Sequence, residues 1–241
     1  MNTVCIATYN GEKFIEEQLR SILVQIDSDD EVIISDDGST DNTLDCIALI
    51  QDPRIRILHS QSHSCKHNFI NALQHAKGEV IFLSDQDDVW LPDKYAICLQ
   101  ELQNADLICT NSILVNEQLD IINPDFFSIY KSGPGIIKNI INNTYYGSCM
   151  AFHRHLLQTA LPMPQTDEIG HDVWLGLVAE IVGKVLFIPQ PLLLYRRHNN
   201  TYTQTTNLLT RSKRSLYKKI ANRWIMLYHI IIFYIKNKIL V

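Results

Sequence analysis

The segment "VIFLSDQDDVW", Val80 to Trp90, decides the fold class of this chain, because an apolar strand ends there in a cluster of charge. The apolar run at its start is of the kind that is buried inside a sheet. Three carboxylates, those of Asp85, Asp87 and Asp88, then fall within four positions. Like charges so close repel one another, so the site must hold a cation or keep a proton on one carboxylate. The segment predicts a sheet whose strand ends carry a charged site, with a divalent metal as the expected cation.

Short β-branched runs alternate with segments of helical periodicity on both sides of this segment. We expect Thr40 or Asp41 to cap the second helix and Pro92 to lie in the first turn of the fourth. The alternation predicts a parallel sheet with helices on its faces, in which right-handed crossovers bring the strand ends to one edge. The expected strands are residues 3–8, 31–35, 54–59, 79–84, 105–115 and 148–154, and the expected helices are residues 12–23, 41–50, 66–76, 92–102 and 171–182.

Polar turns at residues 8–11, 36–39 and 85–88 follow three of these strands, so we expect them to converge where open α/β sheets bind ligands. The second turn, DDGS, is equally explained as ordinary turn chemistry. Carboxylates are hard oxygen ligands that favour Mg²⁺ or Mn²⁺, and Mg²⁺ completes its shell with water and substrate phosphates. The sequence lacks a glycine-rich phosphate loop, so basic side chains must help the metal to bind phosphate. The candidates are Lys66, Arg196, Arg197 and His198, although the two arginines also fit a solvated strand end.

The segment "IGHDVWLG" places a second carboxylate, Asp172, beside apolar residues at the start of a helix. Asp172 is either a helix N-cap or a general base that takes a proton from an incoming hydroxyl. His171 is the alternative base, although a single histidine is more often only hydrogen-bonded or exposed. This segment therefore supplies the candidates for proton transfer.

The composition is that of an ordinary globular protein, because 46% of the 241 residues are hydrophobic, which is enough for one large α/β domain or for one domain plus a small appendage. Six scattered cysteines form no C-x-x-C pair, so we expect a reducing cytosol and no structural zinc. The N-terminal segment does not resemble a signal peptide and is expected to enter the first strand at once. We expect no nucleic-acid partner.

The C-terminal tail differs in charge from the rest of the chain. All 26 acidic residues precede Arg211, whereas the segment from Arg211 to Val241 carries eight of the 21 basic residues. Its apolar part, Trp224 to Ile235, is shorter than the roughly 20 residues that span a bilayer. Two interpretations stay open, a helix in the membrane interface and a helix packed on the domain or on a second copy.

Four blocks together resemble the family 2 glycosyltransferases, which are inverting enzymes with the GT-A fold: "IATYNGEKFIEEQLRSIL", "SDDGSTDNT", "GEVIFLSDQDDVWLPDK" and "GHDVWL". The resemblance covers residues 3–201. The motifs "SDQDDVW", "GHDVWL" and "YRRH" are most similar to those of the rhamnosyltransferases of bacterial surface polysaccharides. It implies an α/β fold of the GT-A type, with a mostly parallel, Rossmann-like central sheet and flanking helices, followed by a C-terminal helical tail. We expect a glycosyltransferase domain over 1–205, divided into a nucleotide-sugar half (1–110) and an acceptor half (111–205), and a tail over 206–241.

The resemblance also implies roles for single residues. Tyr9 and Asp37 match positions that contact the nucleotide base, and Asn10 and Glu12 belong to the same nucleotide-facing turn. The remaining implied roles are Asp87 as the metal ligand, Asp85 at the ribose or the metal, Asp172 as the catalytic base, Gly147 to Met150 on the acceptor side, and His198 at the metal or the diphosphate. Ala7 departs from the usual Pro or Thr with little chemical effect.

The implied reaction is a single displacement with inversion, because the site offers one base and no enzyme nucleophile. It uses Mn²⁺ or Mg²⁺, a dTDP- or UDP-linked sugar as donor, with rhamnose as the candidate sugar, and a saccharide or lipid-linked acceptor. The expected location is the cytoplasm or the inner face of the cell membrane, with the tail contacting lipid or a second subunit. Two alternatives stay open. One is a haloacid-dehalogenase-type phosphatase in which Asp85 attacks phosphate, and the other is a nucleotide-sugar-binding module without turnover.

Overall fold

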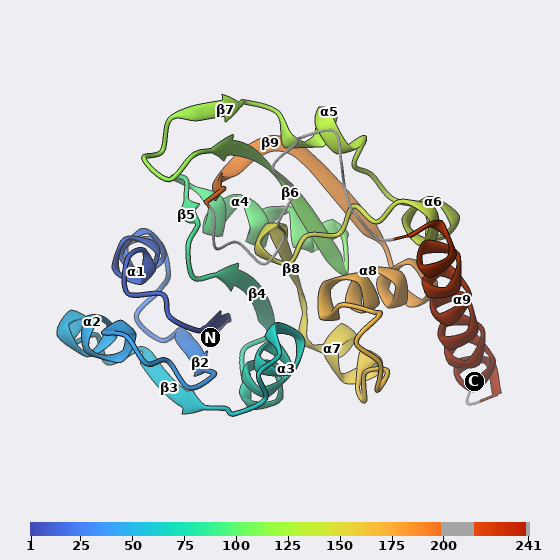
Figure 1. The fold of residues 1–241 in the computed structure, drawn as a ribbon, viewed down its shortest axis with the longest axis horizontal. Helices are drawn as coiled ribbons and strands as arrows, with labels where there is room; N and C mark the ends of the chain where they lie inside the picture. Colours follow the sequence, from blue (N-terminus) through green and yellow to red (C-terminus); the bar gives the residue numbers. More distant parts are fainter. Residues whose placement is uncertain (199–214, 240–241) are drawn as a thin grey trace.

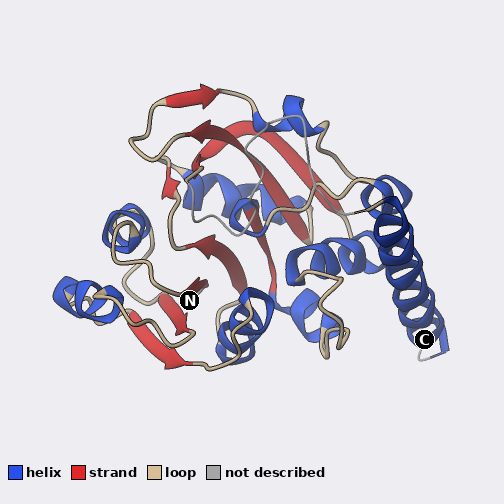
Figure 2. Ribbon diagram, viewed as in Figure 1, coloured by secondary structure: helices blue, strands red, loops and turns tan. Residues whose placement is uncertain are grey.

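The computed structural model describes residues 1–198 and 215–239 of the chain. The strands form one curled nine-stranded sheet in the order β3-β2-β1-β4-β8-β6-β9-β5, with β7 paired to β6 (Figure 1). Helices flank this sheet (Figure 2), which confirms the predicted α/β class. The elements of the first half are β1 (Thr3–Thr8), α1 (Ile15–Leu23), β2 (Glu31–Asp36), α2 (Thr43–Ile50), β3 (Ile55–His59), α3 (Cys65–His75), β4 (Val80–Asp85), β5 (Val89–Trp90) and α4 (Lys94–Glu101).

The four strands β1 to β4 are parallel, so their carboxyl ends lie on one edge as predicted. Two details of this half differ from the sequence prediction. Helix α2 begins at Thr43 after Asn42, so neither Thr40 nor Asp41 is its N-cap. The Asp41 carboxylate instead accepts the backbone N–H groups of Thr43 at 3.0 Å and of Glu12 at 3.1 Å, because the turn after β1 packs against it.

Pro92 lies before α4 and not in its first turn, which is the second correction. The short strand β5 pairs Trp90 with Leu193 of the long C-terminal strand, and the backbone N–H of Leu91 donates to Leu192 at 3.1 Å. This pairing keeps the chain extended beyond Trp90, so the helix begins only at Lys94.

The second half of the sheet is mixed, because β8 is antiparallel to both β4 and β6 while β9 runs parallel to β6. The strands β5, β7 and β9 were not predicted. The elements of this half are η1 (Leu102–Asn104), β6 (Leu107–Val115), β7 (Ile121–Asn123), α5 (Phe126–Tyr130), α6 (Ile136–Ile141), η2 (Gly147–Cys149), β8 (Met150–His153), α7 (Arg154–Ala160), α8 (His171–Val182), β9 (Val185–Arg196) and α9 (Leu216–Ile239).

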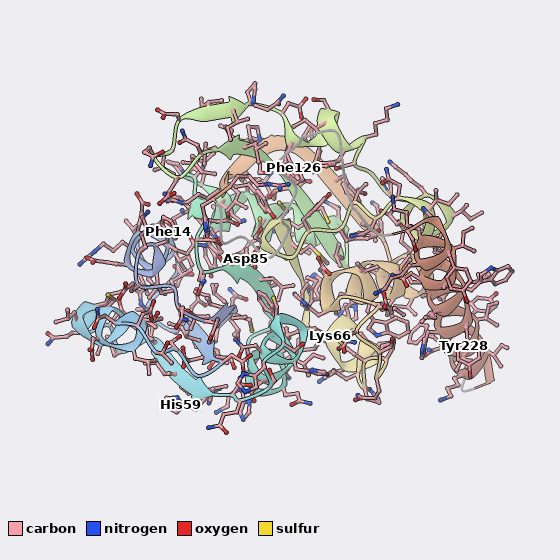
Figure 3. The ribbon with its side chains drawn as sticks, in the orientation of Figure 1. Phe14, His59, Lys66, Asp85, Phe126 and Tyr228 are labelled. Carbon is pink, nitrogen blue, oxygen red and sulfur yellow. The ribbon has the colours of Figure 1, made fainter. Side chains whose placement is uncertain are left out.

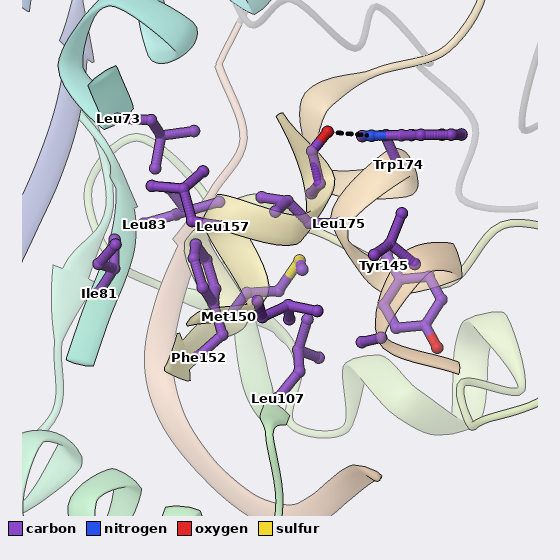
Figure 4. Close-up of a cluster of buried hydrophobic side chains, with 14 of the residues drawn as sticks. Leu73, Ile81, Leu83, Leu107, Tyr145, Met150, Phe152, Leu157, Trp174 and Leu175 are labelled. Carbon is purple, nitrogen blue, oxygen red and sulfur yellow. Dashed lines mark hydrogen bonds between the residues drawn. The ribbon is translucent and has the colours of Figure 1, made fainter. Parts of the chain in front are cut away.

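Alternate residues of the central strands fill two apolar layers, one on each face of the sheet. Cys5 packs with α3, α7 and α8, whereas Val4 and Ile6 pack with α1, α2 and α4. Figure 4 shows the first layer, in which the Trp174 indole donates to the carbonyl of Ala160 at 2.8 Å. The sheet is thus held rigidly from both sides, which fixes the loops at its carboxyl edge.

Helix α9 packs against α6 and α8 at one end of the molecule, and the Phe233 ring meets the Trp174 ring edge-on at 5.5 Å. The tail prediction is only partly covered, because Arg211, Lys213 and Arg214 lie outside the described residues. Within residues 1–198 and 215–239, the structure contains no helix that is both long and apolar enough to cross a bilayer.

Candidate functional site

A pocket of about 620 Å³ opens at the carboxyl edge of the parallel strands, where the three polar turns were expected to converge. Residues 8–9, 37 and 85–88 all line it, so the predicted convergence is confirmed. Asn10, Glu12 and Arg197 do not line the pocket. The predicted site residues that do are Tyr9, Asp37, Lys66, Asp85, Asp87, Asp172, Arg196 and His198.

The acidic turn after β4 gathers three carboxylates whose oxygen atoms lie within 4.8 Å of one another, those of Asp85, Asp87 and Asp88. Burial, together with the charges of Asp87 and Asp172, raises the pKa of Asp85 to about 7. Burial and the neighbouring carboxylates also raise the pKa of Asp88 well above its usual range. Each carboxylate therefore disfavours ionisation of its neighbours, as the sequence implied.

Asp88 shows most directly that this turn suits a cation. Its side chain is 1% exposed, and Oδ1 accepts the backbone N–H of Arg196 at 2.9 Å. Its Oδ2 is buried without a hydrogen-bond partner among the residues that the structure describes. A buried acceptor oxygen beside two further carboxylates fits a hard divalent ion. His198 lies at the rim of this cluster, with Nε2 at 2.8 Å from Oδ2 of Asp87.

Arg196 is the last residue of β9, and its side chain holds the acidic turn in place. Nε donates to the Asp87 carbonyl at 2.7 Å, and Nη1 donates to the Glu117 carbonyl at 2.7 Å. Nη2 pairs with the Glu17 carboxylate, and the guanidinium lies 4.6 Å from the centre of the Phe14 ring. The side chain is only 3% exposed, so most of its donors are already engaged within the protein.

The other two basic candidates also bind protein groups. Nζ of Lys66 donates to the carbonyls of Pro164 at 2.7 Å and Thr166 at 2.6 Å, which anchors the segment before α8 at the rim of the pocket. Nη2 of Arg197 donates to the Tyr130 hydroxyl at 3.0 Å. The sequence predicted these cations as phosphate ligands by their charge, but it carried no signal for the direction in which each side chain points.

Gln86, the middle residue of the acidic turn, joins this turn to the turn after β1. Its Oε1 accepts Oγ1 of Thr8 at 2.6 Å and the backbone N–H of Tyr9 at 2.9 Å, while Nε2 donates to the Tyr9 carbonyl at 3.1 Å. A Cβ at position 11 would overlap Oε1 of Gln86, so glycine at this position leaves space for the Gln86 side chain. Sequence analysis gave Gln86 no role of its own.

The Asp37 side of the pocket is shaped by one buried carboxylate. Its oxygens accept the backbone N–H groups of Ser62 at 2.6 Å and Ser64 at 3.0 Å. Although burial acts to raise it, these hydrogen bonds lower the pKa of Asp37, so the carboxylate stays charged. Tyr9 lines the same space and is 53% exposed. A planar aromatic ligand could therefore stack on Tyr9, beside the 62–64 segment that Asp37 holds in place.

Asn10 and Glu12 stabilise this region from outside the pocket. Oδ1 of Asn10 accepts the backbone N–H of Thr40 at 2.8 Å, and Oε2 of Glu12 accepts that of Asn42 at 2.9 Å. Both side chains thus tie the turn after β1 to the turn after β2.

Asp172 lines the same pocket from the first turn of α8. The N-cap of α8 is Gly170, so the alternative interpretation of Asp172 as the N-cap is wrong. Its Oδ1 accepts only the adjacent N–H of Val173 at 2.8 Å among the described hydrogen bonds. The charge of Asp172 contributes to the raised pKa of Asp85, after burial and the charge of Asp87. Figure 3 locates Asp85 near the centre of the molecule and Lys66 on α3.

His171 is buried next to Asp172, with its ring stacked on Phe69 at 4.2 Å. Burial lowers the pKa of His171, so the imidazole is neutral. Its Nε2 has no hydrogen-bond partner among the described residues, and a Cβ at Gly147 would lie 3.3 Å from that nitrogen. Because residue 147 has no side chain, the backbone there can lie close to this buried nitrogen.

Lys94 is a buried cation near Asp85 and Asp88, and the sequence carried no signal for it. It is 1% exposed, and its Nζ donates to the Ser148 carbonyl at 2.7 Å. Burial lowers the pKa of Lys94, while the nearby thiols and carboxylates oppose that effect. This cation links the acidic turn to the 147–149 segment, next to Asp172.

The chain is similar to known glycosyltransferases. Residues 3–161 match the family described as "Glycosyl transferase family 2". The chain is 31% identical over 239 residues to the dTDP-rhamnosyl transferase RfbG of Shigella flexneri, covering 91% of this chain and 80% of that protein. It is 28% identical over 212 residues to an uncharacterized glycosyltransferase of a Nostoc strain, covering 81% of this chain and 64% of the relative's length.

Solved structures share the architecture at lower identity. S. aureus TarS 1–349 in complex with UDP-GlcNAc superimposes with a TM-score of 0.69 at 18% identity, covering 93% of this chain and 66% of the TarS 1–349 chain. The mannosyltransferase PcManGT of Pyrobaculum calidifontis, in complex with GDP-Man and Mn²⁺, gives a TM-score of 0.63 at 23% identity over 83% of this chain and 58% of that chain. These similarities establish a shared fold.

Proposed function

This chain belongs to glycosyl transferase family 2 and has the GT-A type of fold, and we propose that it moves a sugar from a nucleoside-diphosphate donor to a saccharide or lipid-linked acceptor with inversion at the anomeric carbon. The family match removes the phosphatase alternative, because the acidic turn belongs to a glycosyltransferase domain. The alternative of a binding module without turnover is left for experiment.

One observation carries the proposal: a cluster of three carboxylates and a separate fourth carboxylate line the same pocket from different elements. The acidic turn after β4 supplies Asp85, Asp87 and Asp88, and the first turn of α8 supplies Asp172. Cleavage of a sugar–diphosphate bond needs charge stabilisation on the departing diphosphate and activation of a nucleophile on the opposite face of the sugar. The pocket offers both groups together.

The acidic turn is the proposed metal site. Asp87 and Asp85 are the expected ligands. We add Asp88 as a third, because its buried Oδ2 has no partner among the described residues. His198 contacts the Asp87 carboxylate and is assigned to hold it in place. Mn²⁺ or Mg²⁺ bound there would act as a Lewis acid on the diphosphate. The Mn²⁺ in the PcManGT complex supports this choice of ion.

Asp172 is the proposed base. Its carboxylate takes the proton from the acceptor hydroxyl as that oxygen attacks the anomeric carbon, and the leaving diphosphate departs on the side of the acidic turn. We assign no residue of the pocket as an enzyme nucleophile, so the reaction is one displacement with inversion. The neutral His171 beside Asp172 is assigned to orient the acceptor through its Nε2.

The geometry changes the roles proposed for three residues. Arg196 and Lys66 become positioning residues, because the former fixes the acidic turn and the latter anchors the segment before α8. Arg197 lies outside the pocket lining and is assigned to the packing of β9 on Tyr130. Charge stabilisation of the diphosphate then depends chiefly on the metal, so metal removal should abolish activity.

We propose that Tyr9 and Asp37 form the nucleotide-base side, with Asn10 and Glu12 fixing the turn that carries Tyr9. The donor half is then residues 1–110, the acceptor half is 111–205 and the tail is 206–241. Similarity to the Shigella dTDP-rhamnosyl transferase favours a dTDP-linked rhamnose donor, and the TarS complex supports UDP as the second nucleotide to test.

A donor screen tests this function. The protein is incubated with dTDP- and UDP-linked sugars and Mn²⁺, and release of the nucleoside diphosphate is measured with and without oligosaccharide or lipid-linked acceptors. We expect release that depends on Mn²⁺ and is greatest with dTDP-rhamnose. Tight, Mn²⁺-dependent binding of donor without any release under all acceptor conditions would favour the inactive-module alternative.

A further inference from the structure

The outer face of α9 carries a continuous apolar and aromatic stripe. Its members recur at spacings of three or four residues, so they lie on one side of the helix. Tyr217 is 84% exposed, Trp224 is 67% exposed and Tyr228 is 61% exposed, and Figure 3 locates Tyr228 on the helix at the edge of the molecule. The stripe consists of Tyr217, Ile220, Trp224, Tyr228, Ile231 and Ile235.

The core does not require this stripe, because the opposite face of α9 makes the contacts with the domain. Ile230 is buried, and Ile225, Met226 and Phe233 pack against the apolar layer that contains α8. The helix therefore carries apolar residues both on the face that packs on the domain and on the face that meets solvent.

Two further exposed apolar side chains belong to α6, which packs against α9. Ile137 is 75% exposed and Ile141 is 58% exposed, and the Arg223 guanidinium joins the two helices by donating to the Ile141 carbonyl at 2.7 Å. We call the stripe together with Ile137 and Ile141 the α6–α9 face. Soluble monomers rarely expose a large contiguous apolar surface unless it binds something.

The charged residues of α6 and α9 have one sign. Neither α6 nor α9 contains an acidic residue, whereas α6 carries Lys138 and α9 carries five basic residues. Two copies of this face would bring like charges together, which disfavours self-association. An anionic surface complements it instead. The basic residues of α9 are Lys218, Lys219, Arg223, Lys236 and Lys238.

We propose that the α6–α9 face docks on an anionic lipid bilayer, with its aromatic rings at the level of the headgroups. Tyr and Trp favour this depth because their rings are apolar and their polar ends stay hydrated. Lys218 and Lys236 are exposed beside the stripe and reach the lipid phosphates. Docking would also hold the pocket at the membrane, because α9 packs on α8, whose first turn carries Asp172.

Co-sedimentation of the full chain with vesicles tests this proposal. We expect binding to vesicles that contain phosphatidylglycerol, weaker binding to pure phosphatidylcholine, and a loss of binding as salt is raised. Replacing Trp224 and Tyr228 together by Ser should weaken binding more than about tenfold, because it removes the largest apolar area of the face. Lys218→Gln should weaken binding by about fivefold. Leu49→Ser, on the exposed side of α2, is the matched control and should have no effect.

Two outcomes would overturn the proposal. One is vesicle binding that is absent, or unchanged by the Trp224 and Tyr228 substitutions. The other is a dimer in analytical ultracentrifugation that these substitutions dissociate, without binding to vesicles, which would assign the face to a second copy. Calorimetric binding of dTDP or UDP with Mn²⁺ should be the same in every variant, so failure of the lipid proposal is distinguishable from failure of the proposed function.

Discussion

The raised pKa of Asp85 predicts that the metal-free protein loses stability as the pH rises. The folded protein keeps the Asp85 proton to about pH 7, whereas an unfolded chain loses it near the ordinary value of about 3.9. Between these values the folded state binds more protons than the unfolded state, so the free energy of unfolding falls by up to about 1.4 kcal/mol per pH unit. From pH 5 to pH 7 this one group accounts for about 2 kcal/mol, because the slope falls off as the pH reaches the folded pKa. A change of that size lowers Tm by about 4–8 °C in a protein of this length.

Asp85→Asn isolates this effect, because the amide keeps the shape of the side chain but cannot ionise. The variant should gain stability relative to the wild type as the pH rises from 5 to 7, and the gain should level off above about pH 7. Urea unfolding of both proteins in chelator gives this difference directly. Asp45→Asn, at an exposed position of α2, is the control and should show no such trend.

Added Mn²⁺ should reverse the wild-type trend, because the cation replaces the proton as the partner of the carboxylates. Stabilisation by a ligand grows with its concentration and reaches about 2.7 kcal/mol at a hundred times Kd. We expect a larger Mn²⁺-induced rise in Tm at pH 8 than at pH 6 for the wild type, and a smaller rise for Asp85→Asn. A constant difference between variant and wild type across the pH range would refute the account of Asp85.

Three further predictions concern neighbouring residues. Asp87→Ala should lose Mn²⁺-dependent binding of UDP or dTDP in calorimetric titration, and unchanged affinity would remove Asp87 from the site. Arg196→Met should weaken Mn²⁺ affinity about tenfold by releasing the acidic turn, whereas a loss of nucleotide affinity measured without metal would indicate a direct phosphate contact. His171→Phe should raise KM for the acceptor and leave donor affinity intact, because the ring stack on Phe69 is kept while Nε2 is lost; an equal loss of donor affinity would contradict this role.

The parallel half of the fold could be predicted from the sequence because its signals are local. Apolar strands such as Val80–Asp85 alternate with helices, and polar residues follow each strand, so Tyr9, Asp37 and Asp85 meet at one edge. The long strand β9 was not predicted, because Pro189 and Pro191 interrupt its pattern while its pairing with β6 shifts register near Asn111.

The roles of basic and polar side chains depend on contacts that sequence spacing does not encode. Arg196 and Lys66 have the charge that a phosphate needs, yet 2.7 Å contacts direct the former to the Asp87 carbonyl and the latter to the Pro164 carbonyl. Gln86 becomes informative only when the turn after β1 is seen beside it, and the buried Oδ2 of Asp88, unpaired among the described residues, only when the contact of Oδ1 with the end of β9 is seen. The tail sequence likewise does not show which face of α9 the domain covers.

Asp172→Asn tests the central claim most directly, because it separates catalysis from donor binding at the one residue assigned as base. With the active donor, transfer should fall by about 10²–10⁴ while the affinity for the nucleotide sugar with Mn²⁺ stays the same, and the wild-type product should carry the inverted anomeric configuration by NMR. Near-normal transfer by the folded variant, or a product with retained configuration, would contradict the proposed mechanism.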